Sequence, residues 1–103
     1  MRDRRFAADM LEDAVDLITG PRAESYGPVD ENHDRIASLW NGWLGARREP
    51  AAPLTAHDAL VMMALLKLAR TQCGGGARDN YVDAAAYAAL AGEVSYGGTD
   101  PGD

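Results

Sequence analysis

The segment HDALVMMALLKLAR, residues 57–70, constrains the fold more than any other part of the chain. From Ala59 to Leu66 every residue is apolar, so a helix formed here presents apolar side chains in all directions. Such a helix is stable in water only when other elements cover it on several sides. Thr55 is a suitable N-cap for it, and the glycines at 74–76 break the pattern. We therefore predict that this segment is the central helix of a helical bundle.

Three other segments repeat apolar residues at the spacing of a helix. They extend from about Arg5 to Thr19, from near Asp30 to Leu44 just before Gly45, and from Asp79 or Asn80 to about residue 94. Glycine and proline separate these segments, and the sequence has no convincing strand pattern. The final stretch SYGGTDPGD, residues 95–103, lacks apolar periodicity. We expect an all-α four-helix bundle over residues 1–94 and a flexible C-terminal tail over residues 95–103.

Length and charge limit the classes of partner. A chain of 103 residues is near the size at which oligomerisation often supplies missing burial, so we expect a homo-oligomer, either a dimer or a tetramer. A net charge of −6 disfavours non-specific binding to DNA or RNA. No apolar run approaches the roughly 20 residues that cross a bilayer, so we expect no membrane partner. The single cysteine, Cys73, excludes a disulfide framework within the chain and fits a cytoplasmic protein.

Two cations follow the apolar part of the central segment. Lys67 and Arg70 are three residues apart and therefore share one side of a helix. One interpretation is that they stabilise the negative C-terminal end of the helix dipole while their stems lie on apolar neighbours. The other is that they form a clamp for phosphate or carboxylate groups. Both interpretations stay open at the level of sequence.

Asp79, Asp83 and Tyr87 step by four residues and line one stripe of the last predicted helix. In one interpretation Asn80 is the N-cap and Asp83 an acidic residue of the first turn. In another, Asp79 and Asp83 hold Mg²⁺, which prefers carboxylate oxygens and bridges substrate phosphates. A third has these two carboxylates in a buried ion network with the cations of the central helix.

The stretch ESYGPVDENHDRIASLW, residues 24–40, begins another predicted helix with several polar side chains. Helix geometry directs Asn32 and His33 to the apolar side and Glu31 and Asp34 to the opposite side. We therefore predict that Glu31 and Asp34 are solvated residues at the start of the helix, unless another helix or subunit covers that side. Asn32 is the polar side chain that we expect to face the core, and His33 reads as a packing residue.

Three stretches together resemble a known family of small helical proteins from phages and bacteria. They are YGPVDENHDRIASLW, HDALVMMALLKLAR and DNYVDAAAYAAL, and the resemblance covers about residues 10–92. The pattern of this nucleotide-modification-associated family combines a Tyr-Gly turn, Glu-Asn before an Arg-Ile helix that ends in Trp, a Lys-x-x-Arg helix, and an Asp-x-x-x-Asp helix followed by Gly-Tyr-Ala-Ala. Here Ala86 stands where the family usually has glycine. The resemblance implies a phage-type nucleotide-binding or nucleotide-processing protein in the cytoplasm of a bacterial host.

That family is more distantly similar to the all-α nucleoside triphosphate pyrophosphohydrolases of the MazG and dimeric dUTPase type. These enzymes hold Mg²⁺ with Glu-x-x-Glu on one helix and Glu-x-x-Asp on another, and Glu31-x-x-Asp34 and Asn80-x-x-Asp83 are degenerate versions of the two signatures. The residues that this likeness implies fall into three groups. The metal ligands would be Glu31, Asp34, Asp79 and Asp83, with Glu31 and Asp83 catalytic; Lys67 and Arg70 would bind the phosphates; Asn32 and Tyr87 would orient the ligand.

Three functions follow as hypotheses. The first is a Mg²⁺-dependent pyrophosphohydrolase that cleaves a nucleoside triphosphate between the α and β phosphates. The second is a nucleotide-binding protein without catalysis, which sequesters its ligand or regulates a partner. The third is a structural or interaction protein in which a buried network of Lys, Arg and Asp side chains fixes the register of the helices.

Overall fold

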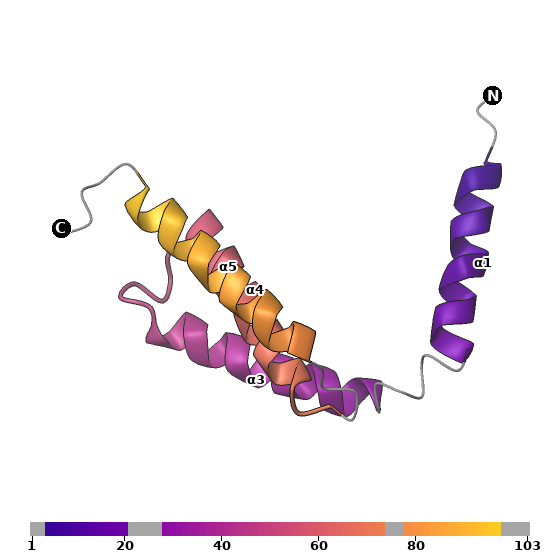
Figure 1. Cartoon of the computed structure of the whole chain (residues 1–103), viewed down its shortest axis with the longest axis horizontal. Coiled ribbons are helices and arrows are strands. Elements are labelled where there is room, and N and C mark those ends of the chain that lie inside the picture. Colours follow the sequence, from indigo (N-terminus) through magenta and orange to yellow (C-terminus); the bar gives the residue numbers. More distant parts are fainter. Residues whose placement is uncertain (1–3, 21–27, 74–77, 98–103) are drawn as a thin grey trace.

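The computed structural model describes residues 4–20, 28–73 and 78–97, and most of these residues lie in helices (Figure 1). The helices are α1 (Arg5–Thr19), α3 (Val29–Ala46), α4 (Ala56–Arg70) and α5 (Arg78–Tyr96). No strand occurs in the described ranges. For the residues that the structure describes, the prediction of an all-α chain with four helices is therefore confirmed.

Helix α4 begins at a complete capping box. The Thr55 hydroxyl oxygen accepts a hydrogen bond from the backbone N–H of Asp58 at 3.2 Å. In return, the Asp58 carboxylate accepts one from the backbone N–H of Thr55 at 3.0 Å. Both donors would otherwise lack partners at a helix start, so this exchange fixes where α4 begins. The prediction of Thr55 as N-cap is confirmed.

Helix α4 lies in the centre of a three-helix layer, as its apolar sequence predicts. It packs against α3 on one side and against α5 on the other, whereas α3 and α5 do not pack against each other. The buried apolar residues of the layer are mostly alanines: Ile36, Ala64, Ala69, Ala84 and Ala91. Small side chains allow α4 and α5 to approach closely, but they bury little apolar area. The layer is thus held by a small core.

Helix α1 lies outside this layer, and the expected packing of all four helices into one bundle is not observed. No contact joins α1 to α3, α4 or α5, and none of its residues is buried. Figure 1 shows it standing apart from the other helices. Apolar periodicity predicts that a helix has a face to cover, but it does not identify the surface that covers it.

The C-terminal boundary also differs from the prediction. Helix α5 continues to Tyr96, so Ser95 and Tyr96 are helical and do not belong to a tail. Residues 98–103, the rest of the predicted tail, lie outside the described residues. Among the helices that are described, none combines the length and apolar character needed to cross a membrane.

Candidate functional site

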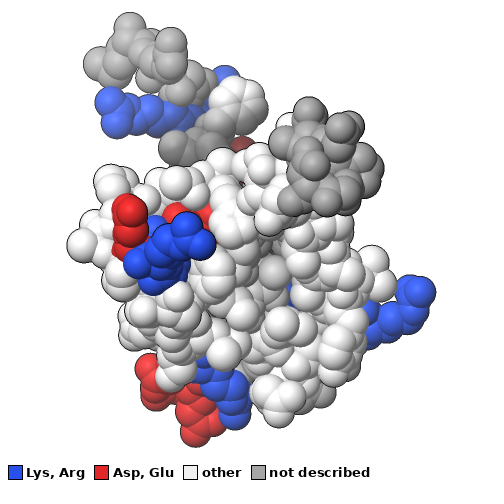
Figure 2. Space-filling view, turned by 90° about the vertical axis from the view of Figure 1, so that its left-hand side faces the viewer, with Lys and Arg blue, Asp and Glu red and all other residues white. Residues whose placement is uncertain are grey.

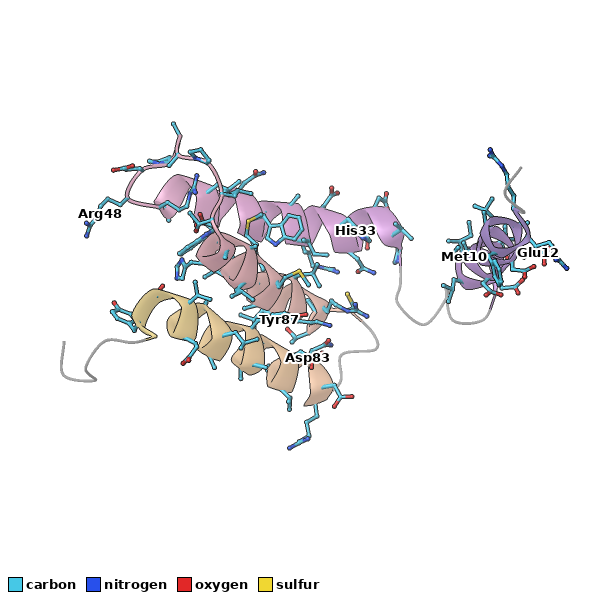
Figure 3. All side chains as sticks on the ribbon, turned by 90° about the horizontal axis from the view of Figure 1, so that it is seen from above. Met10, Glu12, His33, Arg48, Asp83 and Tyr87 are labelled. Carbon is cyan, nitrogen blue, oxygen red and sulfur yellow. The ribbon has the colours of Figure 1, made fainter. Side chains whose placement is uncertain are left out.

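Lys67 of α4 and Asp83 of α5 form an ion pair between the two helices. Lys67 Nζ lies 3.2 Å from Asp83 Oδ2. The Lys67 side chain is 20% exposed and the Asp83 side chain 46% exposed, so solvent reaches the carboxylate side of the pair. Asp83 and Tyr87 both point from α5 toward α4 (Figure 3). The predicted stripe of Asp83 and Tyr87 therefore faces the central helix.

The start of α5 rules out one of the three interpretations of Asp83. Because α5 includes Arg78 and Asp79, Asn80 lies within the helix and cannot be its N-cap. The alternative in which Asp83 is an acidic residue following that cap is therefore wrong. Asp83 is instead positioned by its contact with Lys67.

Asn32 contributes the polar group of α3 at this end of the layer. Its Oδ1 accepts a hydrogen bond from the Cys73 thiol, with Sγ at 3.1 Å, and another from Arg35 at 3.0 Å. The first of these bonds links α3 to the residues that follow α4. Asn32 is half-buried, as its predicted orientation requires. An unpaired amide at such a position would cost free energy, and these two hydrogen bonds avoid that cost. This bond also accounts for Cys73, which is a free cysteine.

The remaining polar residues at the start of α3 are on the surface. Glu31 and Asp34 are exposed, as the helix geometry predicts. His33 is exposed too, so its predicted packing role is wrong; its Nδ1 lies 2.7 Å from the Val29 carbonyl oxygen within the same helix. The direction of a side chain on an ideal helix indicates whether it points toward the layer. It does not indicate whether another helix covers that turn.

The predicted magnesium ligands do not form one site within a single chain. In the described part of the structure, no three His, Cys, Asp or Glu side chains gather closely enough to hold a metal ion. Glu31, Asp34 and Asp79 are exposed, and Asp83 is paired with Lys67. One chain therefore does not fit the metal set that the distant likeness implies. Magnesium binding stays a prediction that would need ligands from a second chain.

A second polar network, which the sequence did not reveal, lies at the other end of α4. Asp58 is buried, and its Oδ2 accepts a hydrogen bond from Arg47 at 2.8 Å. Trp43 Nε1 donates to Asp58 Oδ1 at 3.2 Å. Arg47 also donates to the backbone carbonyls of Pro50 and Ala52, at 2.8 and 2.7 Å. This network ties the connection between α3 and α4 to the capping box.

The geometry of the Arg47–Asp58 network favours a role in stabilising the fold and not in binding a ligand. The side chains of Arg47 and Asp58 are only 10% and 7% exposed, so neither offers a free surface to a ligand. Thr55-x-x-Asp58 is the sequence signature of a capping box and was the available signal. Arg47 was not predictable, because its meeting with Asp58 depends on the path of the intervening chain. Near this network, Trp40 Nε1 donates to the Met62 carbonyl at 2.7 Å and further fastens α3 to α4.

Residues 9–95 match the protein family described as Domain of unknown function (DUF6378). The chain belongs to this family. It is also 41% identical over 81 residues to the Gene 55 protein of Mycobacterium phage L5, covering 79% of this chain and 49% of that protein. The identity to the Gene 55 protein of Mycobacterium phage D29 is 37% over 79 residues, covering 77% of this chain and 48% of that protein. The chain spans about half the length of these curated relatives, and no solved structure matches it.

The match to the DUF6378 family tests the family resemblance that the sequence suggested, and it supports one part of that resemblance. A phage-type protein is confirmed, at the level of a family of unknown function with similar proteins in mycobacteriophages. The more distant likeness to pyrophosphohydrolases stays a prediction. The matched region begins at Asp9, within α1, and ends in α5. Most of α1 therefore belongs to the DUF6378 domain, although α1 lies apart from the three-helix layer.

The ionised Asp58 carboxylate is expected to make the stability of the DUF6378 domain sensitive to acid. The pKa of the Asp58 carboxyl lies below its usual value, mainly because the carboxylate accepts a hydrogen bond from the backbone N–H of Thr55. Burial raises this pKa, whereas hydrogen bonds from the Thr55 hydroxyl, Arg47 and Trp43 lower it further. A carboxyl whose pKa is lowered by folding stabilises the fold above its unfolded pKa, and this contribution is lost as the pH falls through the folded pKa. We expect the melting temperature to fall below about pH 4, the ordinary range for Asp.

The control for this prediction is Asp58→Asn, which removes the titrating group and retains a side-chain oxygen. Melting curves from pH 7 to pH 2 should show a shallower acid decline for Asp58→Asn than for the wild type. Parallel declines in the two proteins would show that other carboxyl groups determine the acid sensitivity.

Proposed function

We propose that this protein binds nucleotides and that Lys67 is the main contact to their phosphates. The observation that carries the proposal is the Lys67–Asp83 pair, in which a cation from an apolar helix meets a carboxylate that is nearly half exposed. A lysine ammonium has three donors, and one contact to Asp83 leaves capacity for phosphate oxygens. Hydrogen bonds between ionised groups are about twice as strong as neutral ones.

Three further residues are part of the proposal for a small ligand. Asn32 of α3 and Tyr87 of α5 bring an amide and a phenol that can orient a base or a sugar, and Arg70 lies one helical turn after Lys67. The net charge of −6 opposes a long nucleic acid, whereas a single nucleotide needs only local cations. The site therefore suits a free nucleotide better than a polymer.

Hydrolysis is a narrower form of the same proposal. The distant likeness to pyrophosphohydrolases supports release of pyrophosphate from a nucleoside triphosphate, but the separation of the acidic side chains within one chain does not. Binding without catalysis therefore agrees better with the geometry. An active hydrolase would need carboxylates from a second chain beside Asp83.

The structural alternative is favoured by the same ion pair, because Lys67 and Asp83 already satisfy each other and join α4 to α5. Exposed pairs contribute little to stability, typically about 0 to 1 kcal/mol, and Asp83 is too exposed for a strongly stabilising role. The two functions predict different effects for substitutions that remove the pair. A structural pair affects only the fold, whereas a phosphate site affects ligand binding.

A thermal-shift screen separates these functions. Nucleosides and their mono-, di- and triphosphates are added to the full chain with and without Mg²⁺, and pyrophosphate release is measured for each stabilising ligand. We expect stabilisation to increase with the number of phosphates, because a ligand that binds only the folded state raises its stability by mass action. Absence of stabilisation by every nucleotide would reject nucleotide binding. Stabilisation with turnover would establish the hydrolase, and stabilisation without turnover a binder.

The role of Asp83 is tested by Asp83→Asn, with Glu93→Gln on the exposed surface of α5 as the matched control. We expect Asp83→Asn to fold with a melting temperature close to that of the wild type and to lose any Mg²⁺-dependent part of the nucleotide stabilisation. Glu93→Gln should retain it. Undiminished metal dependence in Asp83→Asn would show that Asp83 is not a metal ligand.

A further inference from the structure

Helix α5 forms one edge of the three-helix layer (Figure 3). Ala84 and Ala91 are buried on the side that packs against α4, and among the described helices neither α1 nor α3 packs against α5. On a helix with 3.6 residues per turn, six exposed residues fall within about 100° of arc on the opposite side. We call them the outer face of α5: Arg78, Val82, Ala85, Ala86, Ala89 and Glu93.

The outer face of α5 lacks charge where the solvent side of a surface helix normally carries charged and polar residues. Between Arg78 and Glu93 it consists of Val82, which is 46% exposed, and alanines. By contrast, the exposed residues of α3 include Asp34 and Arg35. Figure 2 shows another broad uncharged area of the molecule, with charged side chains at its margins. The three-helix layer therefore has uncharged surface that its own helices do not cover.

The two ends of the outer face carry opposite charges at equal distances from its centre. Arg78 lies seven residues before Ala85, and Glu93 lies seven residues after Ala86. Within the part of the chain that the structure describes, no ion pair holds Arg78 or Glu93. The outer face is therefore complementary in charge to its own reversed copy.

A second copy of α5 in the antiparallel orientation matches this arrangement. With a two-fold axis between the central alanines, Arg78 of each copy lies opposite Glu93 of the other, and Val82 lies opposite Ala89. Each of these pairs occurs twice, because a two-fold contact uses the same surface on both copies. A parallel pair would instead bring like charges together. An anionic membrane or a nucleic acid fits less well, because the net charge of −6 repels it.

We propose that the outer face of α5 is a dimerisation surface, through which two copies of the chain pair by antiparallel α5 helices. A single pair of helices of this length buries less than about 1,200 Å² in total, at the low end of specific interfaces, so the dimer should dissociate on dilution. None of the six residues belongs to the proposed nucleotide site. The proposal therefore does not depend on nucleotide binding.

The first test is the molar mass of the full chain, measured by light scattering and sedimentation over a wide range of concentration. Ala89→Glu should raise the dimer dissociation constant by at least about 100-fold, because it places a charge in the apolar contact twice per dimer. The matched control is Ala88→Glu. Ala88 is exposed and lies about 100° away around the helix, so the control should leave the dimer intact.

Both positions are exposed in the single chain, and circular dichroism verifies that both variants fold. A wild type that remains monomeric up to about 1 mM, which corresponds to negligible affinity, would overturn the proposal. Equal dissociation of the dimer by the two substitutions would overturn it as well.

The second test exchanges the charges at the two ends. Arg78→Glu and Glu93→Arg should each weaken the dimer by about tenfold, because each replaces attraction by repulsion at both ends of the contact. The double variant, which carries both substitutions, should recover the affinity of the wild type, because the two ends are again opposite in charge. Additive losses in the double variant would contradict the antiparallel pairing.

The third test identifies the register by disulfide crosslinking in a Cys73→Ser background. Chains with Val82→Cys are mixed with chains with Ala89→Cys under oxidising conditions. We expect linked dimers in the mixture and none with either variant alone. Within one chain the two positions are about 10 Å apart along the helix, beyond the roughly 7 Å between Cα atoms that a disulfide spans. Crosslinking of Val82→Cys with itself, or no crosslink in the mixture, would overturn the proposal.

Discussion

Replacing Arg47 with alanine is expected to lower the melting temperature by at least about 10 °C, because it removes one partner of a buried ion pair. The Asp58 carboxylate would lose its cation at 2.8 Å while remaining buried. The carbonyls of Pro50 and Ala52 would lose a donor at the same time. The connection between α3 and α4 would keep the capping box at its end but lose the Arg47 bonds to Pro50 and Ala52.

The matched control is Arg48→Ala. Arg48 is the next residue, carries the same charge and is exposed (Figure 3). Its replacement should change the melting temperature by no more than a few degrees, because exposed substitutions usually change stability by about 0.5 kcal/mol or less. Circular dichroism at the helical signal provides both melting curves. Equal effects of the two substitutions would show that the Arg47–Asp58 network does not hold the fold together.

Replacing Ala91 with leucine is expected to destabilise the protein by about 2 kcal/mol, because the larger side chain does not fit between two closely packed helices. Ala91 is only 3% exposed and lies on α5, which packs against α4. Separating the helices enough to admit leucine would also disturb Ala84, which is buried two turns earlier on the same side of α5. Chemical denaturation measures the loss directly.

Ala88→Leu serves as the control for this substitution. Ala88 lies on the same helix but is exposed, so leucine there meets no packed surface. The same substitution should therefore be nearly neutral at Ala88 and costly at Ala91. A neutral Ala91→Leu would mean that α4 and α5 do not depend on small residues for their contact.

The helices were predictable from the sequence because local signals determine where they occur. Apolar spacing and Gly or Pro breaks placed all four, and Thr55 marked the start of α4. The central position of α4 followed from its composition, because a helix that is apolar on every side needs neighbours. These features depend on residues close together in the sequence.

The parts that were not predictable depend on how far one helix extends along another. The direction of His33 was derived from an ideal helix, but the covering helix does not reach it, and the side chain is exposed. The same holds for α1, whose apolar face was recognised while its missing contact with the bundle was not. The meeting of Arg47 with Asp58 was not predicted either, because only the folded path of the chain brings them together.

The candidate site was predicted only in part for the same reason. Asp83 and Tyr87 do turn toward α4 (Figure 3), Lys67 meets Asp83, and Asn32 bonds to Cys73 after α4. Each lies on a stripe that the helical period defines. Of the acidic residues that the distant likeness groups with Asp83, Glu31 and Asp34 are exposed on α3 and Asp79 is exposed on α5. Residues aligned by a pattern share a site only if the helices that carry them meet.

Calorimetric titration with nucleoside triphosphates tests the nucleotide proposal most directly. Deoxynucleoside triphosphates and the corresponding nucleosides are titrated into the wild type, Lys67→Met and Arg48→Met. The wild type should bind a triphosphate at least about tenfold more tightly than its nucleoside, and Lys67→Met should lose about tenfold or more in affinity, the effect of one hydrogen bond to a charged group. Arg48→Met should bind like the wild type. Equal affinity for triphosphate and nucleoside, or unchanged binding in Lys67→Met, would contradict a phosphate site at Lys67.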